Sequence, residues 1–130
     1  MLERLHSEGF ADFDASYLIV VQYPGPQGER PADLAGRLRM SKQALNHLLG
    51  QLERLGYLTR EADPADGRSK RIRLTARGTK AGLVIREAVT EMEDAWAQQL
   101  GPERFAELRT ALQELNERLS SRLVARASIP

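Results

Sequence analysis

The spacing of apolar positions changes twice between residues 41 and 75. Leucines recur at helical intervals after Ser41, and they give one apolar face: Leu45, Leu48, Leu49, Leu52 and Leu55. Ser41 suits the N-cap of that helix, and Gly56 suits its C-terminal end in the left-handed conformation. From residue 57 to 62, and again from 70 to 74, the period falls towards two, which predicts two strands. A turn-forming cluster, Asp63-Pro64-Ala65-Asp66-Gly67-Arg68, separates the strands. We therefore expect a helix over 41–55, called the reading helix below, and a hairpin, or wing, over 57–75.

Shorter elements are expected ahead of this stretch. Residues 1–9 indicate a short helix, and 15–23 a compact helix that ends at the breaker Pro24–Gly28. Pro31 is well placed as the first residue of the next helix, whose inward positions are Leu34, Ala35 and Leu38. The turn into the reading helix falls at Arg39-Met40, where a glycine would suit a positive φ.

Two long helices are expected after the hairpin. Thr75 can cap the first, over 76–100, and Pro102 begins the second, which runs to about residue 126. Each carries a stripe at steps of three and four: Ile85, Val89, Met92 and Trp96 in the first; Phe105, Leu108, Leu112, Leu115, Leu119 and Leu123 in the second. Such stripes favour an antiparallel helical pair or packing on a partner subunit. Residues 127–130 read as a frayed end.

Charge is divided unevenly along the 130 residues, although the net charge is only +1. Residues 28–80 carry 12 Lys/Arg and 6 Asp/Glu, a net +6, whereas the rest carries 7 and 12, a net −5. Positive charge therefore gathers on the proposed reading unit, as binding to phosphate requires.

The first two turns of the helix over 41–55 present a polar face without a carboxylate. Gln43 and Asn46 have the amide geometry to pair with adenine, Lys42 can reach guanine or phosphate, and His47 can donate or accept. Ser41 and the helix N-terminus favour phosphate. A merely solvated face is the alternative interpretation of these residues.

The segment resembles the winged helix-turn-helix core of the MarR family of bacterial transcription regulators. The resemblance rests on Asp63-Pro64, Asp66-Gly67-Arg68, Leu74-Thr75 and Gly78, preceded by the helix SKQALNHLLGQLERLGYL. It covers roughly residues 15–80. It implies a mainly α fold with a small β-wing (α+β), in which 1–130 form one winged-helix domain. Within it, 15–80 would be the DNA-binding core, and 1–14 and 76–126 the dimerisation helices.

The resemblance also implies roles for single residues. In the family, an arginine at the Arg68 position enters the minor groove, and an aspartate at Asp66 braces it. A salt bridge at the tip of the wing is the alternative interpretation of this pair. By their own charge, Lys70 and Arg71 make the wing more basic. The expected partners are double-stranded DNA, a second copy in a homodimer, and a small aromatic effector bound near Tyr17, Met92 and Trp96. The alternative interpretation is that these three side chains pack in the hydrophobic core and do not line a pocket. The function implied is that of a repressor on a pseudo-palindromic operator.

Other functions find little support in the sequence. There is no cysteine, no metal-like spacing of His6 and His47, no nucleotide-binding glycine loop and no nucleophile elbow, so we expect no enzyme, cofactor or metal site. No apolar run has membrane-spanning length and no signal peptide is visible, which predicts a cytoplasmic protein. Two alternatives remain at this point: a PadR-like winged-helix regulator, and a winged-helix adaptor that binds proteins and not DNA.

Overall fold

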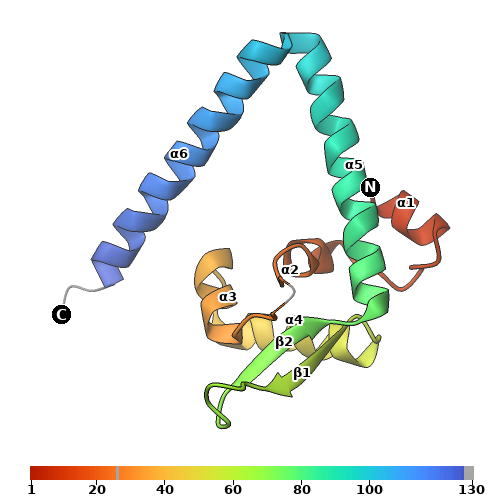
Figure 1. The fold of residues 1–130 in the computed structure, drawn as a ribbon, viewed down its shortest axis with the longest axis vertical. Helices are drawn as coiled ribbons and strands as arrows, with labels where there is room; N and C mark the ends of the chain where they lie inside the picture. Colours follow the sequence, from red (N-terminus) through yellow and green to blue (C-terminus); the bar gives the residue numbers. More distant parts are fainter. Residues whose placement is uncertain (26, 128–130) are drawn as a thin grey trace. The chain divides into compact units, whose positions relative to one another are not determined.

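The computed structural model describes residues 1–25 and 27–127, and it divides into two compact units, Met1–Ala88 and Val89–Pro130. Its elements, in chain order, are α1 (Leu2–Ser7), the 3-10 helix η1 (Ala15–Tyr17), α2 (Leu18–Val21), α3 (Pro31–Leu38), α4 (Lys42–Arg54), β1 (Leu58–Ala62), β2 (Lys70–Leu74), α5 (Ala76–Leu100) and α6 (Pro102–Ala127). Figure 1 shows the β1–β2 hairpin beside α3 and α4. The predicted fold class, mainly helical with a small β-wing, is confirmed.

The turn between α3 and α4 is tight and left-handed. Pro31 opens α3, as predicted, and Arg39 closes it with φ 55° and ψ 40°. The Met40 N–H then donates to the Ala35 carbonyl at 3.1 Å, a bond typical of a left-handed helix end. Ser41 caps α4 by accepting a hydrogen bond from the Ala44 N–H at 3.1 Å. The expected cap of the reading helix is therefore confirmed, and Arg39 adopts the positive φ that usually favours glycine.

The wing is a two-stranded antiparallel sheet in which Leu58 pairs with Leu74 and Ala62 with Lys70. Gly56, with φ 84°, ends α4 in the predicted conformation and turns the chain into β1. Residue Glu29, in the loop before α3, forms a further antiparallel bridge with Ile72. The sheet is thus extended on one side by the segment that leads into the helix-turn-helix.

Aromatic side chains make up the centre of unit 1. Phe13 packs edge-on against both Tyr17 and Tyr57, with ring centroids 5.5 and 5.3 Å apart. Leu5 of α1 is also fully buried in this unit. Residues of the N-terminal segment thus belong to the core of unit 1, and a role for 1–14 in dimerisation stays a prediction.

An ion pair closes the core at one edge. Arg77 contacts Asp12 at 3.0 Å and lies 4.3 Å from the centre of the Tyr57 ring, while the Tyr57 hydroxyl donates to Asp12. Burial and the bond to Asp12 raise the pKa of Tyr57. Burial of Asp12 acts in the opposite sense to its hydrogen bonds with Tyr57 and Arg77, and the bonds prevail, so the pKa of Asp12 is lowered.

The predicted helix over 15–23 is shorter in the structure. Asp14 caps η1, and α2 ends at Val21, two residues earlier than expected. Pro24 disfavours helical dihedrals in the residue before it, which accounts for an early end. Pro26, part of the predicted breaker, lies outside the described residues.

Unit 2 comprises the second part of α5 and α6. The Trp96 and Phe105 rings lie 6.5 Å apart, and Arg109 contacts Glu93 at 2.9 Å. The apolar stripe of α6 is exposed: Leu108, Leu112, Leu115 and Leu119 show 42–56% of their surface. The side chain of Leu123 and the predicted frayed residues 128–130 lie outside the described part. Among the helices described, none has both the length and the apolar character needed to cross a membrane.

Candidate nucleic-acid interface

Helix α4 presents the polar face that the sequence predicts. Lys42, Gln43, Asn46 and His47 are all exposed, whereas Leu45, Leu49 and Leu52 on the opposite side are buried. The first turn of the helix contains no acidic residue. An exposed helix face with amide and basic groups and no carboxylate offers donors and acceptors for base edges at a low electrostatic cost near phosphate.

His47 is held by a side-chain relay that sequence reasoning missed. The Tyr17 hydroxyl donates to Gln51 Oε1 at 3.3 Å, and Gln51 Nε2 lies 3.3 Å from His47 Nε2. Since the amide nitrogen can only donate, His47 Nε2 is the acceptor and Nδ1 carries the proton when the ring is neutral. Buried Tyr17 therefore orients an exposed ring on α4 through Gln51.

Asp66 organises the backbone at the tip of the wing. Its carboxylate accepts hydrogen bonds from the Arg68 N–H at 3.1 Å and from the Ser69 hydroxyl at 3.0 Å. The contact to Arg68 reaches its backbone, so Asp66 shapes the loop that presents the arginine. The Arg68 and Lys70 side chains are exposed beside it. Arg68 therefore lies in the loop that joins β1 to β2, and Lys70 begins β2; Figure 1 shows this loop at the end of the hairpin.

Arg71 is placed differently from the other predicted DNA-binding residues. Its Nε lies 3.2 Å from Asp63 Oδ2, and its Nη1 donates to the Gln27 carbonyl at 3.2 Å. Arg30 also donates to Asp63 Oδ2, at 2.8 Å. The Ala65 N–H and the two arginines lower the pKa of Asp63, and the same carboxylate raises the pKa of Arg30.

The residues predicted to line an effector pocket lie in different units. Tyr17 is buried in the aromatic core of unit 1, whereas Met92 and Trp96 are 41% and 50% exposed in unit 2. An effector site that uses all three stays a prediction.

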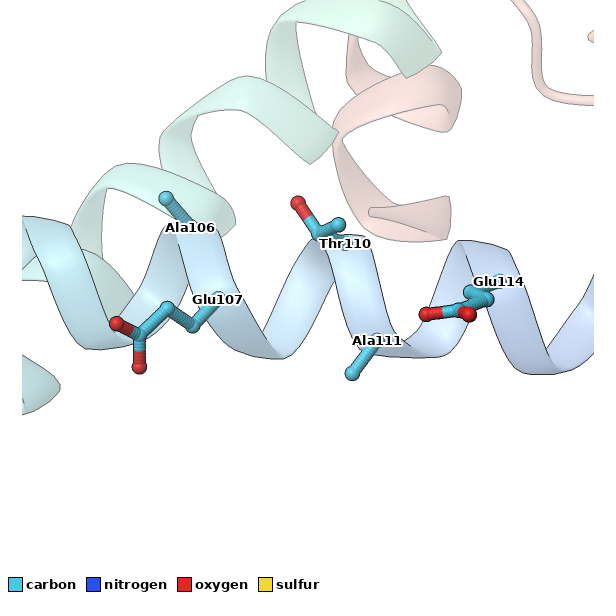
Figure 2. Close-up of a pocket in the computed structure, with 5 residues that line it drawn as sticks. All are labelled: Ala106, Glu107, Thr110, Ala111 and Glu114. Carbon is cyan, nitrogen blue, oxygen red and sulfur yellow. The ribbon is translucent and has the colours of Figure 1, made fainter.

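An open hollow lies along α6. Figure 2 shows the residues that line it, and all come from that one helix: Ala106, Glu107, Thr110, Ala111 and Glu114. They are all exposed and include neither an aromatic ring nor a cation. The hollow is therefore poorly suited to an aromatic anion. Within the described residues, no group of His, Asp or Glu side chains is arranged to hold a metal ion.

Sequence reasoning also missed how β1 supports α4. Arg60 donates to the Asn46 carbonyl at 3.3 Å and pairs with Glu53 at 3.8 Å. Strand alternation places Arg60 on the same face as buried Leu58, but the reach of its long side chain to α4 has no local signal in the sequence.

This chain is similar to known proteins in its fold and in the sequence of its helix-turn-helix. The model of the MarR family matches residues 26–69. The MepR–DNA complex of S. aureus is 25% identical with a TM-score of 0.68, over 90% of this chain and 85% of that one. FabT of Streptococcus pneumoniae, solved with DNA, is 20% identical with a TM-score of 0.75, over 92% and 86% of the two chains. The transcriptional regulator SlyA is 18% identical with a TM-score of 0.74, over 92% and 84%. No curated protein matches the chain significantly.

The family match covers the helix-turn-helix and most of the wing, and the fold of the remaining elements agrees with it. It favours the MarR-like over the PadR-like interpretation. Over residues 26–69 the chain thus resembles the MarR family of winged helix-turn-helix transcriptional regulators, and its fold is the one found in the solved regulators named above.

Proposed function

We propose that this protein is a homodimeric repressor that binds a pseudo-palindromic operator in double-stranded DNA. The observation that carries this proposal is the exposed, carboxylate-free face of α4, formed by Lys42, Gln43, Asn46 and His47. In this proposal α4 enters the major groove, where base edges present a distinguishable set of donors and acceptors. Gln43 and Asn46 read bases, and Ser41 with the N-terminus of α4 contacts phosphate.

The wing supplies a second contact in this proposal. Arg68 enters the minor groove beside α4, with Asp66 shaping its loop, and Lys70 adds positive charge. DNA binding itself is supported by two similar solved structures, because MepR and FabT were each solved with DNA. An arginine in the minor groove senses groove width and potential more than base identity.

Dimerisation is supported by the exposed apolar stripe of α6. Leu108, Leu112, Leu115 and Leu119 would remain in water in a monomer, and a continuous apolar stripe of this kind marks an interaction surface. The same stripe on a second copy of α6 can cover these leucines, because a two-fold dimer uses the same surface patch on both subunits. A dimer places two α4 helices on one duplex, so we expect two half-sites about one turn apart. Bound over a promoter, such a dimer blocks transcription.

Release by an effector is the final part of the proposal. A small aromatic molecule that contacts Tyr17, Met92 or Trp96 would act by favouring one of two dimer geometries. Its effect would be a shift in population between DNA-binding and released states, with no new chemistry. The half-exposed ring of Trp96 in unit 2 supports an aromatic ligand.

Fluorescence anisotropy tests the DNA proposal. The purified protein is titrated onto the duplex upstream of its own gene and onto a scrambled duplex, at two salt concentrations. We expect preferential binding that weakens steeply with salt. Gln43→Ala should weaken binding to the upstream duplex alone, whereas Arg68→Ala should weaken binding to both. Arg118→Ala removes the same charge from α6, in unit 2, and serves as the matched control.

The outcomes separate two classes of protein. A protein-binding adaptor would show no salt-dependent affinity for either duplex, and that result at low salt would refute the proposal. Equal loss of affinity in all three variants would refute the assignment of α4 and the wing as the contact surfaces.

A further inference from the structure

Asp63 is a charged residue in an unusual environment. It lies directly after β1, and its side chain is only 1% exposed. Among the residues that the structure describes, Asp63 is the one charged residue in the buried class. Burying a carboxylate costs free energy unless the charge is paired, so the partners of Asp63 stabilise it in this position.

The partners of Asp63 come from two segments distant in sequence. Arg30, at the N-cap of α3, donates to Oδ2 at 2.8 Å, and Arg71 of β2 approaches the same oxygen at 3.2 Å. The other oxygen, Oδ1, accepts from the Ala65 N–H at 2.9 Å. One carboxylate therefore joins the base of the wing to the start of the helix-turn-helix.

Backbone bonds reinforce this junction. Arg71 Nη1 donates to the carbonyls of Gln27 and Gly28, at 3.2 and 3.5 Å. Glu29 and Ile72 exchange two hydrogen bonds of 3.0 and 2.8 Å. One β-bridge thus joins the loop before α3 to β2, and the Arg71 side chain spans from β2 to the same loop.

We propose that Asp63 and Arg71 are positioning residues that hold the wing at a fixed orientation to α4. This proposal rests on the proposed DNA-binding function. Arg68 and the exposed face of α4 can reach the two grooves of one duplex together only if the hairpin cannot swing on α3. The Arg30–Asp63–Arg71 clamp supplies that constraint, since a buried carboxylate is stable only while its charged and hydrogen-bonding partners stay in place. Arg71, predicted from the sequence to contact DNA, acts on DNA through the placement of Arg68.

Charge-matched variants test the proposal by anisotropy. Asp63→Asn and Glu61→Gln each remove one negative charge from the wing, and Glu61 pairs with Arg73 in an exposed site. Electrostatics alone predicts that both variants bind DNA as tightly as the parent or more tightly. The clamp predicts that Asp63→Asn binds roughly twofold to thirtyfold more weakly, the range typical of residues coupled to a binding surface, while Glu61→Gln does not.

The effect of Arg68→Ala on DNA affinity, measured with and without Asp63→Asn, distinguishes the clamp from a general loss of stability, which would leave that effect unchanged. Arg68→Ala should weaken binding less in the Asp63→Asn background than in the parent, because a misplaced wing has already lost part of its contact. Equal effects of Arg68→Ala in both backgrounds would overturn the proposal, as would Asp63→Asn that binds like Glu61→Gln.

Arg71→Lys provides the second variant, and it keeps the pair between Arg30 and Asp63. A residue in direct contact with phosphate would tolerate lysine, whereas the clamp needs the guanidinium fork to reach both Asp63 and the loop carbonyls. Weaker binding by Arg71→Lys supports the clamp, and parental affinity overturns it. Circular dichroism establishes that each variant is folded, and if Asp63→Asn is not, Arg71→Lys decides. Absence of DNA binding by the parent protein would reject the proposed function itself, which keeps the two failures distinct.

Discussion

Gly78 lies where the N-terminus of α5 passes directly over the backbone at the start of the wing. A Cβ added at Gly78 would meet the Tyr57 carbonyl oxygen at 1.9 Å and Leu74 Cδ2 at 3.3 Å. The first distance is about 1 Å short of the 3.0 Å below which real Cβ contacts essentially never fall. The obstacle is backbone, and the same oxygen already accepts a hydrogen bond from the Thr75 N–H at 3.1 Å. Gly78→Ala must therefore displace the helix from Tyr57.

The size of the effect follows from two opposed contributions. Forcing extra volume into a packed site costs typically about 1–3 kcal/mol and sometimes more. Alanine regains up to about 1 kcal/mol of helix propensity, and less in a first turn. Because the clash is with backbone, the upper part of the cost range applies, and we expect Gly78→Ala to lose about 2 kcal/mol. For a chain of this size that lowers the Tm by roughly 8 °C.

Gly82→Ala, one turn further along α5, is the matched control. Its added Cβ would lie 3.9 Å from Val21 Cγ1, an ordinary van der Waals contact. Helix propensity then predicts a gain of about 0.5–1 kcal/mol and a Tm raised by roughly 2–4 °C. Thermal unfolding followed by circular dichroism measures both variants, at one protein concentration, because association would otherwise shift the Tm.

The opposite signs make the comparison decisive. Both variants introduce the same methyl group into the same helix. The change in helix propensity, and any effect of the methyl group on expression, should therefore have the same sign in both. A Gly78→Ala protein as stable as Gly82→Ala would refute the close approach of α5 to Tyr57. It would also remove the physical reason for the glycine in the Leu74-Thr75…Gly78 motif.

Three further predictions test other parts of the molecule. Arg39→Gly should unfold in urea with a free energy up to about 1 kcal/mol higher than that of Arg39→Ala, because both remove the side chain but only glycine adopts φ 55° without strain; equal free energies of unfolding for the two variants would contradict this. The lowered pKa of Asp12 contributes stability that is present above its ordinary value of 3.8 and is lost as the pH falls through the folded-state value. The urea midpoint of Asp12→Asn should therefore depend less on pH below about pH 4 than that of the parent, and equal slopes would contradict the sign. Leu112→Glu should convert a dimer into a monomer in light scattering, and an unchanged mass would reject the α6 interface.

Features fixed by a few neighbouring residues could be predicted from the sequence. The Ser41 cap, the left-handed Gly56 and the start of α3 at Pro31 each depend on chemistry within one or two turns of chain. The positive φ at Arg39 is different, because an arginine there does not indicate it; the tight helix-turn-helix connection requires it all the same. The early end of α2 shows the limit of this reasoning, since the apolar run alone does not locate a boundary.

Side-chain partners distant in the chain could not be predicted in this way. Asp63 was recognised as a turn residue, but its partner Arg30 lies 33 positions earlier, and no period connects the two. Tyr17 was assigned to an effector pocket with plain core packing as the alternative, and its ring packs on Phe13 in the core of unit 1. Hydrophobic spacing establishes that a residue is buried, and it does not identify the side chains that surround it.

These contacts between distant residues have one feature in common that bears on function. The relay from Tyr17 through Gln51 orients His47 on α4, and the clamp at Asp63 orients the wing. In both cases a buried group supports an exposed one that we propose to meet DNA. Residues that touch a ligand are visible in a sequence because their chemistry is unusual for a surface. Residues that position such ligand-binding side chains look ordinary in the sequence, and their role appears only when the fold brings the two together. Mutations at Gln51 or Asp63 should therefore change DNA recognition without removing a direct contact to DNA.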